Sequence, residues 1–384
     1  MSAMSIEPYY VLNLFMYLGS NSTNLNTTHT MKPFSYLTVL LILLCTGCSN
    51  DEPLTLTGET PVVKAEAFYT VLSEENITYA VGLAHTNTSA SAFSIPLKLD
   101  IYYPDNKLGN RPVYMFIHGG GFRGGTKTKP EIVSMANFYA SRGWVFISID
   151  YRTTEELGVI QGMTQAEVLT YYKGLAPHEW VNHALQAAEN ADQVQQATAM
   201  YLAQRDAKAA LRWIVANAST YNVSKDFITV GGASAGAITT VALGISNQED
   251  FRDEISLSDD PTLSTTNLSE SYEVKSMVYF WGSNIKLDVF EAVYDLIPYS
   301  SYDSSDPELF MGHGTATDLV TPYEEALELQ SIYNSLGVYN TLVTLLQPNG
   351  EPAGHGAWNA VVNGKDLSEL TFDFLVERQQ LTVN

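Results

Sequence analysis

The sequence predicts an α/β protein with a mostly parallel, doubly wound sheet. Three observations support this class. Short apolar stretches alternate with longer helix-like stretches, glycine-rich turns follow two of the apolar stretches, and candidate reactive residues come where apolar stretches end. In sheets of this kind, ligands bind at the carboxyl ends of the strands. We therefore expect the functional residues at that edge.

The expected elements follow one another along the chain. We expect strands at residues 97–103, 112–118, 144–150, 227–232, 274–281, 308–313 and 340–346. We expect helices at residues 130–142, roughly 180–218, 235–246, 321–336 and 366–379. Between Asn76 and Ala92, many Ser, Thr and Asn residues predict irregular or edge structure.

The most informative turn is Gly232-Ala233-Ser234-Ala235-Gly236, which lies between a strand-like and a helix-like stretch. This G-x-S-x-G pattern is typical of a nucleophile elbow, in which small neighbours allow a tight turn that exposes the serine hydroxyl. The alternative is a plain tight turn formed for packing. The other motifs favour a nucleophilic Ser234.

A second turn follows the apolar stretch 112–117 and has the sequence His118-Gly119-Gly120-Gly121-Phe122. Glycines let backbone N–H groups face a ligand without a Cβ atom in the way. In acyl transfer, such donors stabilise the oxyanion, and losing one typically costs on the order of 3 kcal/mol. The sequence therefore predicts an oxyanion-binding loop here.

An acid and a base complete the pattern. Asp318 follows the expected strand 308–313, and His355 lies in Gly354-His355-Gly356. A serine hydroxyl needs a base to accept its proton, and the base needs an orienting acid. His313 is a rival base, but it precedes the acid in the chain. Asp318 could instead be a turn or cap aspartate, and His355 a loop histidine.

With the order Ser234, Asp318, His355, the chain resembles the α/β-hydrolase esterases that carry HGGG and GxSxG motifs, such as hormone-sensitive-lipase-like carboxylesterases. Residues 119–127 are also similar to the loop of the bifunctional acetylxylan/feruloyl esterase-like group. The resemblance runs from about Leu97 to the C-terminus. The elbow begins Gly-Gly-Ala rather than Gly-Asp or Gly-Glu, which argues against the lipase-like branch.

The resemblance implies an α/β-hydrolase fold and a serine carboxylic ester hydrolase that works through an acyl-enzyme. It assigns the oxyanion donors to the N–H groups of Gly120, Gly121 and Ala235. Short-chain, acetyl or aromatic esters are the expected substrates, either small or borne on a polymer. A serine peptidase of the same fold and a non-catalytic surface-binding lipoprotein are the alternatives.

Three aromatic residues adjoin the expected catalytic strand ends or loops: Phe122, Trp281 and Trp358. They are candidates for lining a substrate pocket, although large apolar residues near a sheet edge are more often core. No cofactor and no metal is expected.

The stretch after Tyr151-Arg152 is longer than the resemblance leads one to expect. Residues 153–205 carry Ala- and Gln-rich helical sequence. We expect a helical cap over the active site, because long insertions in compact domains are usually functional. The alternative is an external extension of the helix that ends near Asn217.

Two other motif matches point to different functions. Gly119 to Gly124 formally matches the dinucleotide-binding G-x-G-x-x-G, but Thr126 to Pro130 separate it from the next helix. His178 and His183 resemble a zinc motif, but their spacing of five puts them off one helical face. Neither reading is favoured.

The N-terminal sequence predicts export. Residues 1–30 are interpreted as an over-extended start, 31–47 as a signal peptide, 48–60 as a tether beginning at a lipidated Cys48, and 61–384 as the hydrolase domain. We expect an outer-membrane or cell-surface lipoprotein of a diderm bacterium. An ordinary signal peptide, giving a periplasmic or secreted protein, is the alternative.

The composition agrees with an exported, acidic enzyme. The formal net charge is −22, which disfavours nucleic acid and anionic membranes as partners, so a membrane contact is expected only through the lipid. Both cysteines lie in the signal region, which leaves no disulfide for the mature domain. The oligomeric state stays open.

Overall fold

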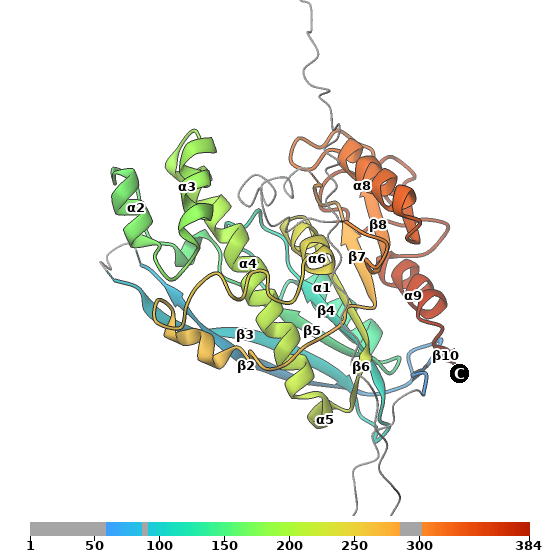
Figure 1. The fold of residues 1–384 in the computed structure, drawn as a ribbon. Coiled ribbons are helices and arrows are strands. Elements are labelled where there is room, and N and C mark those ends of the chain that lie inside the picture. Colours follow the sequence, from blue (N-terminus) through green and yellow to red (C-terminus); the bar gives the residue numbers. More distant parts are fainter. Residues whose placement is uncertain (1–58, 87–90, 285–301) are drawn as a thin grey trace, which may run out of the picture. The chain divides into compact units, whose positions relative to one another are not determined.

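The computed structural model describes residues 59–86, 91–284 and 302–384 (Figure 1). Its centre is an eight-stranded sheet with the order β2-β3-β5-β4-β6-β7-β8-β9. The strands are β2 (Val71–Ala84), β3 (Phe93–Pro104), β4 (Arg111–Ile117), β5 (Val145–Ile149), β6 (Val223–Ala233), β7 (Ser276–Phe280), β8 (Glu308–Gly314) and β9 (Asn340–Leu345). The signal peptide, Cys48 and nearly all of the tether lie outside the described residues.

The sheet is parallel from β5 through β4 to β9, and antiparallel only where β2 pairs with β3 and β3 with β5. The expected class, with a mostly parallel, doubly wound sheet, is confirmed. All seven expected strands are present within a few residues of their predicted ends. A separate pair, β1 (Val62–Val63) and β10 (Thr382–Val383), joins the two ends of the described chain.

The side chains of β4 alternate between two buried hydrophobic clusters, one on each face of the sheet. Val113, Met115 and Ile117 belong to one buried cluster, whereas Tyr114 and Phe116 belong to the other. Side chains on a strand point alternately to opposite faces, so a fully buried strand must be apolar throughout. This is why residues 112–117 form a continuous apolar stretch.

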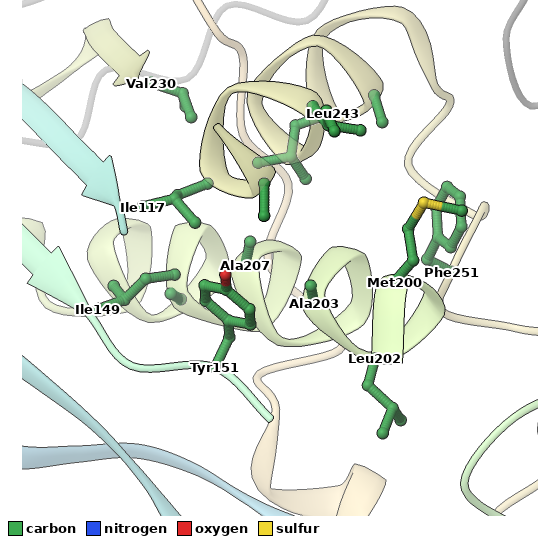
Figure 2. Close-up of a cluster of buried hydrophobic side chains, with 14 of the residues drawn as sticks. Ile117, Ile149, Tyr151, Met200, Leu202, Ala203, Ala207, Val230, Leu243 and Phe251 are labelled. Atoms are coloured by element: carbon green, nitrogen blue, oxygen red, sulfur yellow. The ribbon is translucent and has the colours of Figure 1, made fainter. Parts of the chain in front are cut away.

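Helices cover both faces of the sheet. The first cluster includes α4 (Ala191–Ala216), α6 (Ala235–Ile245) and α8 (Tyr323–Leu336), and the second includes α1 (Pro130–Ala140) and α9 (Leu367–Arg378). Figure 2 shows Ile117, Ile149 and Val230 of the sheet in one cluster with side chains of α4 and α6. The elbow and the glycine loop both leave the sheet at the carboxyl ends of strands, above this packed core.

Residues 153–205 form a short 3₁₀ turn (Thr154–Glu156), α2 (Gln165–Tyr171), α3 (His178–Ala187) and the first half of α4. The expectation of a single helix over roughly 180–218 was wrong, because α3 and α4 are separate helices. The chain is extended at Ala188, and the Asn190 side chain caps a new helix by accepting from the N–H of Gln193. A four-residue helix, α5 (Ala218–Tyr221), follows α4.

A buried ion pair joins the two residues that flank this insertion, Arg152 before it and Asp206 after it. The side chains of Arg152 and Asp206 are 3% and 2% exposed, and their closest N···O distance is 2.6 Å. Asp206 also accepts a hydrogen bond from the backbone N–H of Arg152. Removing one member of such a pair leaves an uncompensated buried charge, which is strongly destabilising.

Irregular or edge structure was expected between Asn76 and Ala92, and the structure places the residues up to Ala84 in β2, at the edge of the sheet. β2 is a 14-residue edge strand with register shifts between Glu74 and Ile77 and between Thr78 and Ala80.

Among the described residues, none of the helices has the length and hydrophobicity that a membrane crossing requires.

Candidate active site

Ser234 occupies a strained turn between β6 and α6. Its backbone has φ 55° and ψ −120°, which is unusual for a residue with a side chain. A Cβ atom on Gly232 would lie 2.3 Å from the backbone of Gly236, and one on Gly236 would lie 2.0 Å from the carbonyl oxygen of Ile117. The two glycines are therefore sterically required for the turn.

The structure brings the three residues expected from the sequence together. The Nε2 atom of His355 is 3.0 Å from Oγ of Ser234, and its Nδ1 atom is 2.9 Å from Oδ2 of Asp318. Ser234 comes from the turn between β6 and α6, Asp318 from the loop after β8 and His355 from the loop after β9. The arrangement allows His355 to accept a proton from Ser234 while Asp318 fixes the imidazole.

The carboxylate of Asp318 is firmly held, with its side chain only 2% exposed. Oδ1 accepts from the backbone N–H groups of Val320 (2.8 Å) and Thr321 (3.1 Å). Burial alone would raise the pKa of Asp318, but these hydrogen bonds and the one from His355 outweigh it and hold the pKa below its usual value. The carboxylate therefore stays charged beside the histidine.

Thr321 was not singled out from the sequence. Its hydroxyl oxygen is 3.0 Å from three atoms: Oδ2 of Asp318, Nδ1 of His355 and the carbonyl oxygen of Trp281. The side chain is buried. The one available signal was the Asp-x-x-Thr spacing, in which a threonine follows an aspartate within one turn.

The glycine loop, residues 118–125, lies beside Ser234. A Cβ atom on Gly119 would lie 2.6 Å from the carbonyl oxygen of Ala233, and Gly120 has a φ of 130°. Ala235 is the first residue of α6, so its N–H has no acceptor within the helix and lies at the positive end of the helix dipole. Gly120, Gly121 and Ala235 are thus placed around the serine, and their role as oxyanion donors remains a proposal.

Gln196 of α4 reaches this loop from the insertion. Its Nε2 atom donates a 2.7 Å hydrogen bond to the carbonyl oxygen of Gly121. Nothing in an Ala- and Gln-rich helical sequence distinguishes this glutamine from its neighbours. The contact links the insertion directly to the loop next to the serine.

Two cavities meet at Ser234. The first, which we call the helix cavity, has a volume of about 390 Å³ and lies among α3, α4, α6 and the glycine loop. The second, which we call the loop cavity, has a volume of about 610 Å³ and is lined by the glycine loop, Trp281, His355 and Trp358. Gly121, Gln196, Ser234 and Val320 line both.

The three aromatic candidates divide between the cavities. Phe122 lines the helix cavity, whereas Trp281 and Trp358 line the loop cavity. The two tryptophan rings meet edge to face with centroids 5.2 Å apart, and the Lys129 ammonium lies 5.0 Å from the Trp358 ring. Trp281 is almost fully buried and so also belongs to the core.

The competing motifs do not form other sites in the described part of the chain. His313 is buried on β8, where its ring bonds the carbonyl oxygen of Gly314. α1 begins only at Pro130, well after the glycines. Across residues 59–86, 91–284 and 302–384, no group of three or more His, Cys, Asp or Glu side chains could hold a metal ion.

Comparison with known proteins places the chain among α/β-hydrolases. The BD-FAE family model matches residues 99–163 and 190–332, more than half of the chain. The chain belongs to the BD-FAE family. This confirms the resemblance to α/β-hydrolase esterases drawn from the glycine loop and the elbow. The gap in the match, 164–189, falls inside the insertion.

Individual relatives are more distant. The chain is 30% identical over 147 residues to phenmedipham hydrolase from Pseudarthrobacter oxydans, a match that spans 38% of this chain but only 22% of that protein. Among solved structures, the propionate-bound esterase Est2 from the Planctomycetes species Thermogutta terrifontis has a TM-score of 0.51 at 20% identity, covering 79% of this chain and 94% of that one. The same esterase phosphorylated by paraoxon has a TM-score of 0.50 at 21% identity, with the same coverage. The shared feature is the fold.

Proposed function

We propose that the protein is a serine carboxylic ester hydrolase that works through an acyl-enzyme. The observation that carries this proposal is the hydrogen-bonded chain Ser234–His355–Asp318, with distances of 3.0 and 2.9 Å, at the turn where Ser234 is strained and exposed to two cavities. Membership of the BD-FAE family supports it.

In the first half of the reaction, Oγ of Ser234 attacks the ester carbonyl carbon and gives its proton to Nε2 of His355. The carbonyl oxygen becomes an oxyanion, which the N–H groups of Gly120, Gly121 and Ala235 stabilise. The intermediate then collapses, the bond to the alcohol oxygen breaks, and that oxygen takes the proton from Nε2. The alcohol leaves, and Ser234 carries the acyl group.

In the second half, His355 takes a proton from water, and the resulting nucleophile attacks the acyl carbon. Collapse of this intermediate breaks the bond to Oγ, which takes the proton back from Nε2. The carboxylic acid leaves and the free serine is restored. Asp318 stays ionised throughout and stabilises the imidazolium that forms in each half.

Replacing the nucleophile tests this proposal. Ser234→Ala and His355→Ala should each lower kcat for a p-nitrophenyl ester by several orders of magnitude, and the double variant should lose little more, because the residues act as a unit. Paraoxon, which phosphorylates the Thermogutta esterase, should modify the parent protein but not Ser234→Ala. His313→Ala is the control for the base. Full esterase activity in Ser234→Ala would refute the mechanism.

We further propose that the protein is exported and anchored through a lipid on Cys48. The support is the sequence alone: a basic start at Lys32, an apolar stretch too short to span a bilayer, and a cysteine followed by polar and acidic residues. Cys48→Ser should abolish labelling of the protein by a fatty-acid probe. Unchanged labelling would refute the anchor without bearing on the esterase activity.

A further inference from the structure

The two cavities at Ser234 differ in which catalytic groups they expose. His355 lines the loop cavity but does not line the helix cavity. Of the three expected oxyanion donors, Ala235 lines only the helix cavity, Gly120 lines only the loop cavity and Gly121 lines both. The site is therefore asymmetric about the serine hydroxyl.

This asymmetry determines how an ester lies in the site. The leaving alcohol oxygen must take its proton from Nε2 of His355, so the alcohol part must lie on the side that His355 faces. The tetrahedral carbon has four substituents: Oγ, the oxyanion, the leaving oxygen and the acyl chain. Once the first three are placed, the acyl chain is directed away from His355, toward the helix cavity.

We propose that the helix cavity is the acyl-binding site, that the loop cavity binds the alcohol, and that the enzyme favours esters of medium-length or bulky acyl groups over acetyl esters. This inference rests on the proposed ester hydrolase function. It identifies the insertion as the element that sets the acyl preference.

The lining of the helix cavity supports an apolar occupant larger than an acetyl group. Its apolar residues include Phe122, Ala184, Ala187, Ala197, Met200 and Ile238, and the polar His183 and Gln193 also line it. The three alanines come from the facing helices α3 and α4, and their small side chains leave the space between these helices open. With about 390 Å³ available, the single methyl of an acetyl group would leave most of the cavity unfilled.

Met200 adds adaptability to this cavity. It has several rotatable bonds and a polarisable sulfur, which lets it adjust to acyl groups of different shape.

The amide of Gln196 is engaged by the carbonyl oxygen of Gly121, so this polar group is satisfied before an acyl chain enters.

The test compares two substrate series at matched concentrations of active sites, counted by paraoxon titration. One series varies the acyl chain of p-nitrophenyl esters from acetate to hexanoate, and the other varies the alcohol of acetate esters. Each methylene buried in the cavity should raise kcat/KM by up to about fourfold. We expect the parent to prefer hexanoate to acetate by at least tenfold.

Filling the cavity should reverse this preference. Ala197→Phe, and Ala187→Phe at an exposed position that tolerates a larger side chain, should each lower the hexanoate-to-acetate ratio at least tenfold. Glu179→Phe adds the same side chain to an exposed position of α3 outside the cavity and should keep the parent ratio. Trp358→Ala should change the ranking of alcohols and keep the ranking of acyl chains.

Two outcomes would overturn the inference. A parent that prefers acetate, or Phe substitutions that change the alcohol ranking but not the acyl ranking, would show that the helix cavity does not hold the acyl group. In both cases, titration by paraoxon and loss of activity in Ser234→Ala would leave the hydrolase function intact. A parent that neither turns over esters nor reacts with paraoxon would refute the function and the inference together.

Discussion

Removing the hydroxyl of Thr321 is the most specific test of the hydrogen-bond network behind the catalytic histidine. Thr321→Val keeps the shape of the buried side chain but removes a hydroxyl that lies 3.0 Å from both Oδ2 of Asp318 and the carbonyl oxygen of Trp281. Oδ2 keeps its hydrogen bond to Nδ1 of His355. The hydroxyl has one proton, so it donates to only one of these two oxygens at a time. A hydrogen bond to a charged group contributes about 1.5–3 kcal/mol.

If that energy is expressed in the transition state, kcat should fall by about one to two orders of magnitude. KM should change little, because Thr321 lines the helix cavity and valine has nearly the same size and shape. The assay is steady-state hydrolysis of a p-nitrophenyl ester, with a thermal unfolding curve for each variant. Thr321→Ser retains the hydroxyl and should keep kcat within a few-fold of the parent.

The comparison between Thr321→Val and Thr321→Ser decides whether the hydroxyl of Thr321 positions the catalytic acid or base. If Thr321→Val keeps the parent kcat, the hydroxyl does not position the acid or the base. If serine is as impaired as valine, loss of the hydrogen bond cannot be the cause, because serine retains the hydroxyl, and the fit of the whole threonine side chain is then responsible. A purely structural role would lower the unfolding temperature of Thr321→Val without the change in kcat.

Three further predictions follow from other contacts. Gln196→Leu should lower kcat about two- to tenfold, because it releases the glycine loop. The control is Gln195→Leu, since the Gln195 amide donates to the carbonyl oxygen of Gly158 within the insertion and not to the glycine loop. Asp206→Ala should cost about 3–5 kcal/mol in urea unfolding, because it leaves the buried charge of Arg152 unpaired. The pKa of Asp318 is lower in the folded than in the unfolded chain, so its stabilisation is present above the unfolded pKa of about 3.9 and is lost as pH falls through the folded pKa. Unfolding free energies should therefore fall more steeply below about pH 4 in the parent than in Asp318→Asn, and parallel curves would contradict this.

The glycine loop and the elbow were predictable because steric demands there leave few residue choices. Gly232, Gly236 and Gly119 each stand where a Cβ atom would come within 2.6 Å of backbone. The juxtaposition of Ser234 and His355 was expected from their order, since strand ends in a parallel sheet meet at one edge. Their catalytic roles stay predictions until the variants are measured.

Other features left too weak a signal in the sequence. β2 is an edge strand paired on one side only, and its two register shifts interrupt the alternation that would have indicated a strand. The division between α3 and α4 depends on one capping residue, Asn190, inside a helix-favouring stretch. The cavity residues of α4 lie in a segment so rich in Ala and Gln that no single face stands out.

The long helix α4 affects how the substrate range of this enzyme can change. Its second half is buried in the core together with α6 (Figure 1). Its first half forms one wall of the helix cavity. A wall built on a continuous, anchored helix is already in place before substrate arrives, so no binding energy is spent on ordering it. Ser234, Asp318 and His355 stand on other elements. On the proposal that the helix cavity binds the acyl group, exchanging single side chains such as Ala197 or Met200 in the first half of α4 changes the substrate range, while Ser234, Asp318 and His355 stay unchanged.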